Sequence, residues 1–352
     1  MTSARACKPP KADYPMSNRP IWTPLHARLH QTLRQRRLLQ QHQGVLIAVS
    51  GGQDSLCLAK LLLDLQPKWG WKLAIAHCDH RWQFDTGLAA HVQQIAQTWA
   101  VPFYLQIAPD LPPSEAAARE WRYQALIEVA QAQGFQSVVT GHTKSDRAET
   151  VLYNLIRGAG ADGLQALTWQ RPLTTELQLV RPLLEVSRSE TFGFCQDEHL
   201  PIWEDAYNQD LKYARNRIRQ ELLPYLKTNF NPQVEKALAQ TAELLRADVE
   251  YLENCAQELR QQAMAREDLE TTSKEYTPPR LNRLVLQPAS LSLQRRVIRQ
   301  FLKDAQKSAP SYEQIEAVTA LITAPNRSRT SSFGEGAIAE VEGNWIILRQ
   351  SP

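Results

Sequence analysis

Residue types that bind charged ligands gather first in a short loop between two apolar segments. Residues 45–49 are apolar and bounded by turn formers, which is typical of a buried strand, and residues 56–65 carry leucines at helical spacing. The connecting loop reads Ser50, Gly51, Gly52, Gln53, Asp54, Ser55. Glycines let a backbone approach a phosphate closely, and free amides at a helix N-terminus favour an anion. The loop therefore predicts a phosphate site.

The carboxylate of Asp54 adds a condition to this prediction. A carboxylate that faces a phosphate repels it unless a cation lies between them, so we expect Asp54 to be a Mg²⁺ ligand. The lysine of a GxxxxGKS/T loop is missing from this segment, which excludes that class of phosphate loop. The alternative is a plain glycine turn capped by Asp54 and Ser55.

A second group of ionisable side chains begins another predicted helix, at residues 143–157. His142, Asp146 and Glu149 have the i, i+4, i+7 spacing that places side chains on one helix face, directly after a strand at residues 137–140. A lone His or Asp at a helix start is usually a cap. Three such groups within two turns favour chemistry next to the phosphate loop.

Two sets of arginines are candidates for binding phosphate. Arg119 and Arg122 share one face of a predicted helix at residues 115–130, whose buried stripe is Trp121, Ala125 and Val129. Their alternative role is surface pairing with Glu115 or Glu120. The second set is Arg215, Arg217 and Arg219, which stand at every second position. Residues at this spacing cannot all share one helix face, so some of them must point to a phosphate backbone or to solvent.

The elements around these residues predict an α/β fold. Further strands at residues 72–77 and 103–107 alternate with helices, which is typical of a doubly wound parallel sheet. A long helix at 232–264 precedes two helices and a terminal hairpin, which predict a small α+β domain. We expect a disordered tail at 1–20, a catalytic domain at 21–226, a connecting helix and linker at 227–279, and the α+β domain at 280–352.

Composition limits the classes of function. The five cysteines are scattered without a CxxC pair, which argues against a disulfide framework, a zinc site and a cysteine-held iron–sulfur cluster, and fits a reducing cytoplasm. No apolar run approaches the roughly 20 residues of a membrane helix. Residues 1–40 hold eight Lys or Arg against one Asp, and residues 280–303 hold six without an acid. This distribution permits a nucleic-acid partner.

The loop at residues 50–55 resembles the SGGxDS loop of the PP-loop ATP pyrophosphatases, which split ATP into AMP and pyrophosphate. The chain further resembles the tRNA(Ile)-lysidine synthetase family within that group. The matching segments are HCDH at 77–80, AAAREWRY at 116–123, GHTKSDRAET at 141–150, RGAGADGL at 157–164, RPLL at 181–184 and WEDAYNQDLKYARNRIRQELLP at 203–224.

This resemblance implies a carbon–nitrogen ligase. ATP adenylates O2 of the wobble cytidine in tRNA(Ile) with a CAU anticodon, and free L-lysine then displaces AMP to form lysidine. The implied ATP-binding residues are Ser50, Gly51, Gly52, Gln53, Asp54, Ser55 and His77. The implied catalytic residues are His142, Asp146, Arg119 and Glu149, with Mg²⁺ on Asp54 and Asp146. We assign tRNA binding to the α+β domain and to Arg122, Arg215, Arg217 and Arg219.

Two departures from the family pattern leave roles open, at Arg81-Trp82 and at Arg147. A PP-loop tRNA thiolase is an alternative, against which the missing CxxC pair argues. A second alternative is a nucleotide-gated tRNA-binding protein without ligase activity. Such a protein needs no acid that faces a phosphate, so the presence of these acids argues against it. The sequence leaves the oligomeric state open, with a homodimer as one alternative.

Overall fold

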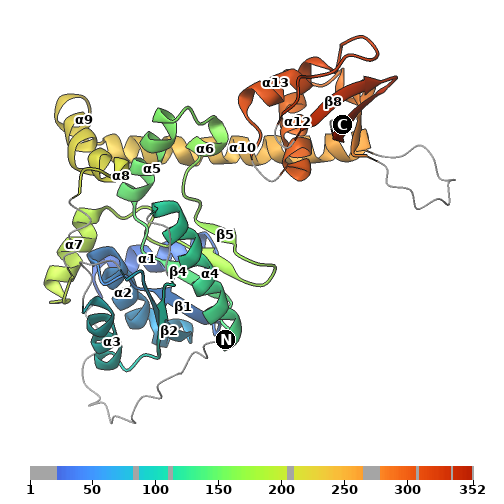
Figure 1. Cartoon of the computed structure of the whole chain (residues 1–352). Coiled ribbons are helices and arrows are strands. Elements are labelled where there is room, and N and C mark those ends of the chain that lie inside the picture. The colour runs from blue at the N-terminus through green and yellow to red at the C-terminus, as the bar shows by residue number, and fades with distance from the viewer. Residues whose placement is uncertain are drawn as a thin grey trace. The chain divides into compact units, whose positions relative to one another are not determined.

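The computed structural model describes residues 22–81, 87–109, 114–203, 210–264, 278–306, 309–333 and 336–350. The chain divides into two compact units, Met1–Glu243 and Leu244–Pro352 (Figure 1). The predicted tail at 1–20 and most of the predicted linker lie outside the described residues, so the domain boundaries stay a prediction. Along the described parts of the chain, no helix combines the length and apolarity that crossing a membrane requires.

The first unit is built on a six-stranded sheet. Its strands are β1 Gly44–Ala48, β2 Lys72–Asp79, β3 Phe103–Ile107, β4 Ser137–Thr140, β5 Gln170–Pro172 and β6 Gln178–Val180. Its helices include α1 Pro24–Gln35, α2 Gln53–Trp69, α3 Leu88–Thr98, α4 Glu115–Gln133, α5 Lys144–Ile156 and α7 Arg188–Asp197. Helix α1 ends earlier than the leucine spacing suggests, because Arg37 adopts a positive φ and turns the chain.

The strand order is β3-β2-β1-β4-β6-β5, and all neighbours are parallel except β5 and β6. The predicted parallel sheet is therefore confirmed with one correction: its edge strand β5 forms a short antiparallel hairpin with β6. The chain moves outward from β1 to β3 and then returns to the other side of β1 with β4. In open sheets, ligands bind at the carboxyl ends of strands at such a switch point.

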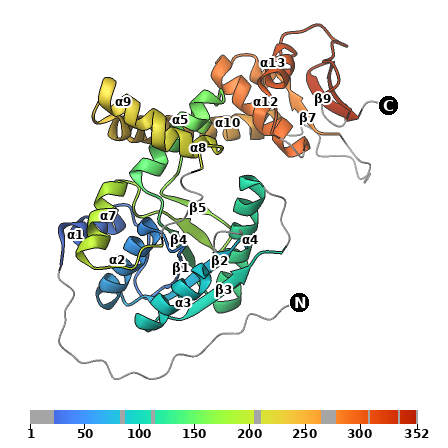
Figure 2. The same cartoon turned by 60° about the vertical axis from the view of Figure 1, so that its left-hand side comes forward.

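Alternating residues of each strand face different helices. Val45 and Ile47 of β1 belong to a core that includes residues of α1, α2, α3 and α7, whereas Leu46 packs in a second core with α4. The figures show α4 on one face of the sheet and α1, α2, α3 and α7 on the opposite face (Figure 1, Figure 2). Burial on both faces explains why the strands are continuously apolar.

The remaining helices of the first unit follow the sheet. They are α6 Ala161–Leu164, α8 Ala214–Arg217, the π-helical turn η2 Ile218–Leu222, α9 Leu223–Asn229 and the start of α10 Val234–Met264. Ala148 and Leu152 of α5 pack with Ile218 and Leu223, which attaches α5 to this helical segment. Helix α5 thus joins the sheet to α8 and η2.

The second unit is the small α+β domain that the sequence predicts. Beyond the rest of α10 it contains β7 Arg280–Asn282, α11 Arg283–Leu286, α12 Leu291–Ala305, α13 Tyr312–Ala320, β8 Ala337–Glu342 and β9 Trp345–Gln350. The strands form an antiparallel sheet in the order β7-β9-β8. Its core includes Val297 and Phe301 of α12, Val318 of α13 and Val341 and Ile346 of the hairpin.

Candidate active site

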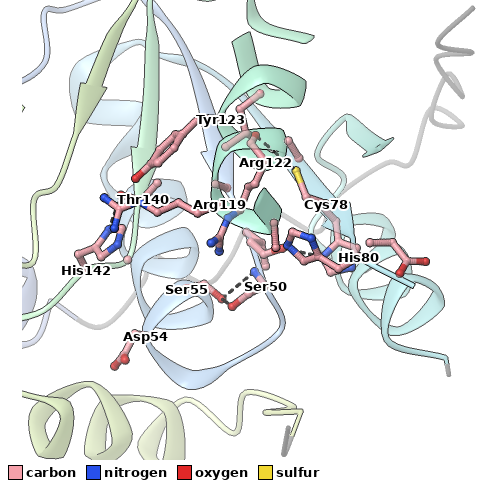
Figure 3. A pocket seen from close by; sticks show the side chains of 18 of the residues that line it. Ser50, Asp54, Ser55, Cys78, His80, Arg119, Arg122, Tyr123, Thr140 and His142 are labelled. Atoms are coloured by element: carbon pink, nitrogen blue, oxygen red, sulfur yellow. Dashed lines mark hydrogen bonds between the residues drawn. The ribbon is translucent and has the colours of Figure 1, made fainter. Parts of the chain in front are cut away.

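A cavity of about 340 Å³ lies at the carboxyl ends of β1, β2 and β4, where the strand order reverses. Its size suits a small-molecule ligand. Most of the predicted chemistry lines it, as Figure 3 shows for the labelled side chains. Its predicted polar lining residues are Ser50, Asp54, Ser55, His77, Arg119, Arg122, His142, Asp146 and Arg215.

The phosphate loop depends on glycine for its path. Gly51 has a φ of +86°, which side-chain-bearing residues rarely adopt, and a Cβ there would lie 2.5 Å from Leu88 Cδ1. Helix α2 begins just after Gly52, which forms the N-cap without a side-chain hydrogen bond. The first-turn amides of α2 therefore have no side-chain cap, which leaves them to an anion.

The turn after β4 contacts this loop directly through backbone. A Cβ on Gly141 would lie 2.8 Å from the carbonyl oxygen of Asp54 and 2.9 Å from the amide nitrogen of Ser55. Ser55 also closes the loop internally, because its hydroxyl accepts from the Ser50 amide at 3.1 Å and donates to the Gly52 carbonyl at 2.9 Å. The loop and the His142 turn are thus held together at van der Waals distance.

Asp54 is held by α7, a helix that the sequence analysis missed. The Thr191 hydroxyl donates to one oxygen of Asp54, and Arg188 Nε lies 3.4 Å from the other. Gln53 Nε2 donates to the Arg188 carbonyl at 2.8 Å, and Gln53 is not among the residues that line the cavity. Burial raises the pKa of Asp54, Arg188 opposes this, and Asp146 adds to it. The carboxylates of Asp54 and Asp146 are therefore close enough to repel one another.

Asp146 and His142 occupy the helix start as predicted, and both line the cavity. Asp146 also caps α5, since its Oδ2 accepts from the amide and the hydroxyl of Thr143, each at 2.7 Å. Burial raises the pKa of Asp146, but the Thr143 hydrogen bonds and the charge of Arg219 oppose burial, and the pKa lies below its ordinary value. Burial and the charge of Arg181 lower the pKa of His142, which keeps the imidazole neutral.

Glu149 does not line the cavity, because it lies behind Asp146 in an ion pair. Arg219 Nε and Nη2 donate to its two oxygens at 2.7 and 2.8 Å, and Nη2 also reaches Asp146 Oδ1 at 3.4 Å. The Glu149 side chain is only 4% exposed. Arg219 sits in the π-helical turn η2, a distortion that is common at functional sites. Its placement differs from the tRNA contact that we expected from the sequence.

The other predicted arginines separate into two places. Arg119 and Arg122 extend from α4 toward the cavity, as their helical spacing predicts (Figure 3), and Arg215 joins them from α8. Arg217 lines a different hollow on the same unit. The predicted buried stripe holds at Ala125 and Val129, whereas Trp121 is half-buried and packs edge-on against His80.

His77 presents a polar atom that has no hydrogen-bond partner among the residues that the structure describes. Its Nδ1 lies 2.8 Å from the Val49 carbonyl oxygen, so this nitrogen carries the proton and donates it. Burial lowers the pKa of His77, which favours the neutral ring. Nε2 is then a buried acceptor, in a residue that lines the cavity, and no described residue donates to it. A ligand with an exocyclic amino group would satisfy it.

The carboxylates fit a hard divalent cation in part. Asp54 and Asp146 are oxygen ligands close enough to raise the pKa of Asp54, which a cation between them would relieve. Among the residues that the structure describes, no group of three or more His, Cys, Asp or Glu side chains forms a metal cage. Mg²⁺ commonly binds through one or two carboxylates together with substrate phosphates, so this donor set suits it.

Sequence reasoning missed Arg188 and Thr191, although a local signal marks their helix. Ser187 and Glu190 form a capping box at the start of α7, with the Ser187 amide and hydroxyl both donating to Glu190. The S-x-x-E spacing is visible in the sequence and predicts a helix start. The role left open for Arg147 is structural: it is 2% exposed, and its Nη2 lies 2.7 Å from Glu243 Oε2 of α10.

Comparison with known proteins identifies the relatives of this chain. The tRNA(Ile)-lysidine synthase of Nostoc sp. is 64% identical over 334 residues, which cover 94% of this chain and 98% of that protein. The enzyme of the same name from Synechocystis sp. is 52% identical over 331 residues, with 92% and 97% covered. The chloroplastic one of Zygnema circumcarinatum is 35% identical over 328 residues, with 83% and 78% covered.

One solved structure supports the fold alone. The U34-tRNA thiolase NcsA of Methanococcus maripaludis matches 63% of this chain and 77% of its own, with a TM-score of 0.53 and 18% identity. Two family models match separate parts of the chain, a PP-loop domain at residues 23–226 and a TilS substrate binding domain at residues 281–341. With these models and the high identities along most of its length, the chain belongs to the PP-loop family of tRNA(Ile)-lysidine synthases.

Proposed function

We propose that this protein ligates free L-lysine to C2 of the wobble cytidine in tRNA(Ile) with a CAU anticodon, at the expense of ATP, which leaves as AMP and pyrophosphate. The observation that carries this proposal is the cavity at the switch point of the sheet. It combines an uncapped helix N-terminus, two facing carboxylates, three arginines and a neutral histidine. This set suits transfer of an adenylyl group to a nucleobase oxygen.

ATP would place its phosphates on the amides of the Gly51–Asp54 loop. Asp54 and Asp146 would hold Mg²⁺, which when bound neutralises charge that develops on the departing pyrophosphate. Arg188 beside Asp54 orients that carboxylate and opposes the rise in its pKa that burial causes. His77 Nε2, as an acceptor, suits the amino group of a base in the cavity.

His142 and Arg119 act on the reacting groups. The neutral imidazole has Nδ1 2.8 Å from the Thr140 hydroxyl, which fixes the ring and leaves Nε2 to contact the α-phosphate. Arg119 is a permanent cation at the cavity wall, and it balances the negative charge on the α-phosphate oxygens in the pentacoordinate transition state. Adenylation turns the cytosine O2 into a good leaving group, which the amine then displaces at C2.

Lysine arrives as an ammonium with a reference pKa of ~10.4 and must lose a proton before attack. Asp146 and Glu149 are the candidate acceptors, and the structure gives them different positions. Asp146 lines the cavity with a lowered pKa, whereas Glu149 has a pKa raised by burial and is held by Arg219. We assign the amine contact to Asp146, and we regard Glu149 and Arg219 as positioning residues that fix Asp146 from behind.

We assign the tRNA contacts to arginines that can reach the phosphates of the tRNA. Arg122 and Arg215 line the cavity that receives the cytidine, so we place them on its phosphates. In the second unit, Arg295 pairs with Glu316, and Arg296 and Arg299 pair with Glu253, which leaves less free positive charge than the sequence suggests. Binding is expected to weaken with rising salt in proportion to the phosphates contacted.

The test is a ligation assay with the full chain, ATP, Mg²⁺, lysine and a tRNA(Ile) transcript with a CAU anticodon. We expect pyrophosphate release that requires tRNA and that continues beyond one turnover only when lysine is present, and a wobble nucleoside whose mass has increased by lysine less water. A matched transcript with uridine at the wobble position is the control. Tight binding of ATP and tRNA without any mass change would instead support the non-catalytic binding protein.

A further inference from the structure

A second hollow in the first unit takes no part in the mechanism above. It has a volume of about 580 Å³ and lies among α5, α8, η2 and α9. We call it the tyrosine groove, and its lining residues are Tyr153, Ile156, Arg157, Ala214, Arg217, Ile218, Glu221, Leu222 and Tyr225. Ile156 is 67% exposed and Tyr225 56% exposed, so this groove presents apolar surface to solvent. Such surfaces on a soluble protein commonly mark binding sites.

The groove combines aromatic rings with guanidinium groups. Arg157 lies 5.3 Å from the centre of the Tyr153 ring and donates to the Tyr153 hydroxyl at 2.7 Å. Tyr225 stands next to Phe230 on α9, with ring centres 5.8 Å apart and edge-to-face, and Phe230 is itself 71% exposed. Exposed rings beside cations are the pattern by which proteins stack unpaired bases and hold their phosphates.

One residue connects this groove to the active site. Arg215 lines the catalytic cavity, and its guanidinium carbon also lies 5.6 Å from the centre of the Tyr153 ring. Arg217, two residues further along α8, lines the groove. A nucleic-acid strand that enters the cavity past Arg215 therefore meets the groove next.

We propose that the tyrosine groove binds a nucleotide adjacent to the reacting cytidine, with its base stacked on Tyr225 and its phosphate near Arg157 or Arg217. This inference rests on the proposed function, since it takes tRNA as the substrate. The two arginines outnumber the single acid, Glu221, which favours a polyanion over an apolar peptide. A splayed anticodon would bring one base into the cavity and its neighbour into the groove.

The first experiment measures tRNA affinity of the full chain at fixed salt by fluorescence anisotropy. Tyr225→Ala is expected to weaken binding about 10-fold, which is the contribution of one stacked base. Tyr225→Phe keeps the ring and should bind as the wild type does. Phe192→Ala removes an exposed ring from α7 of the same unit and serves as the matched control without an effect. Unchanged affinity in Tyr225→Ala would overturn the proposal.

The second experiment removes the base instead of the ring. A transcript with an abasic site next to the target cytidine, on the 5′ or the 3′ side, should bind the wild type about 10-fold more weakly on one side only. In Tyr225→Ala the same abasic site should not lower the tRNA affinity further, because the ring and the missing base form one and the same interaction. If the losses of affinity from Tyr225→Ala and from the abasic site are independent and additive, the proposal is overturned. The comparison uses binding measurements alone, so it still tests the groove if the wild type forms no lysidine.

A second copy of the chain is the competing occupant of the groove. Sedimentation of the wild type and Tyr225→Ala distinguishes it. A dimer that Tyr225→Ala dissociates while tRNA affinity stays unchanged would assign the groove to self-association and refute nucleotide binding.

Discussion

Arg219 donates hydrogen bonds to both carboxylate oxygens of Glu149, from Nε at 2.7 Å and from Nη2 at 2.8 Å, although the two residues lie 70 positions apart in the chain. The pair is almost enclosed, because Glu149 is 4% exposed and Arg219 25%. A buried carboxylate that loses the cation paired with it carries a large energetic cost. The pair therefore links the π-helical turn to the helix that bears Asp146.

Replacement of Arg219 tests this linkage. We expect Arg219→Ala to lower the free energy of unfolding by about 3–5 kcal/mol, since it leaves Glu149 as an unpaired buried charge. Urea unfolding followed by circular dichroism measures the change. The double variant Arg219→Met with Glu149→Leu should recover most of the loss, because it removes both charges. A loss below about 1 kcal/mol in the single variant would show that the pair is not buried in solution.

The glycines of the site should differ in their tolerance of a methyl group. Gly51→Ala forces a positive φ on alanine and should cost about 1–3 kcal/mol of stability. Gly141→Ala places its Cβ against the Asp54 backbone and should weaken ATP binding as the loop shifts. Gly52→Ala is the control for stability, because its nearest atom is the Ser50 hydroxyl at 3.7 Å. Differential scanning calorimetry and ATP titration measure both effects, and equal stability of all three variants would contradict the geometry.

The carboxylates Asp54 and Asp146 should be required for chemistry more than for folding. Asp54→Asn and Asp146→Asn are expected to reduce the ligation rate at least about 100-fold, which corresponds to several kcal/mol of charge stabilisation by a bound metal. Chelation of divalent ions should abolish ligation by the wild type in the same assay. Glu120→Gln, an exposed carboxylate on α4, is the matched control. Full activity of either aspartate variant would remove the metal from the proposal.

Glu190 gives the fold a dependence on acid pH. The Arg28 and Ser187 bonds outweigh burial and lower the pKa of Glu190 from 4.5 to about 2. Because the folded-state pKa is the lower one, this stabilisation is complete above pH 4.5 and is lost as the pH falls toward 2. Glu190→Gln should therefore lower the melting temperature at pH 7 and by a smaller amount at pH 3.5. A difference that stays constant with pH would show that the ion pair contributes nothing.

The local patterns of the chain predicted the fold and the phosphate loop well. Apolar runs placed strands β1 to β4 within one or two residues, and the glycine loop between β1 and α2 marked the ligand end of the sheet. Helix α7 has no strong apolar stripe, so its capping box was its only local signal. Strands β5 and β6 contain three residues each, which is too short for a period to appear.

Long-range pairing accounts for what the sequence did not reveal. The alternation of Arg215, Arg217 and Arg219 predicts different directions, but nothing local predicts that Glu149 receives the last of them. The basic stretch at residues 280–303 contains no acid, yet Glu253 and Glu316 from other helices neutralise part of it. A charge count along the chain therefore overstates the positive surface of the folded unit.

The contact between Gly141 and the Asp54 backbone has a consequence for redesign. Main-chain atoms set the separation of the two halves of the reaction centre, so exchanging side chains around the rim leaves that separation intact. Substitutions in the cavity wall, for example at Tyr123, can therefore reshape the cavity without moving these main-chain atoms.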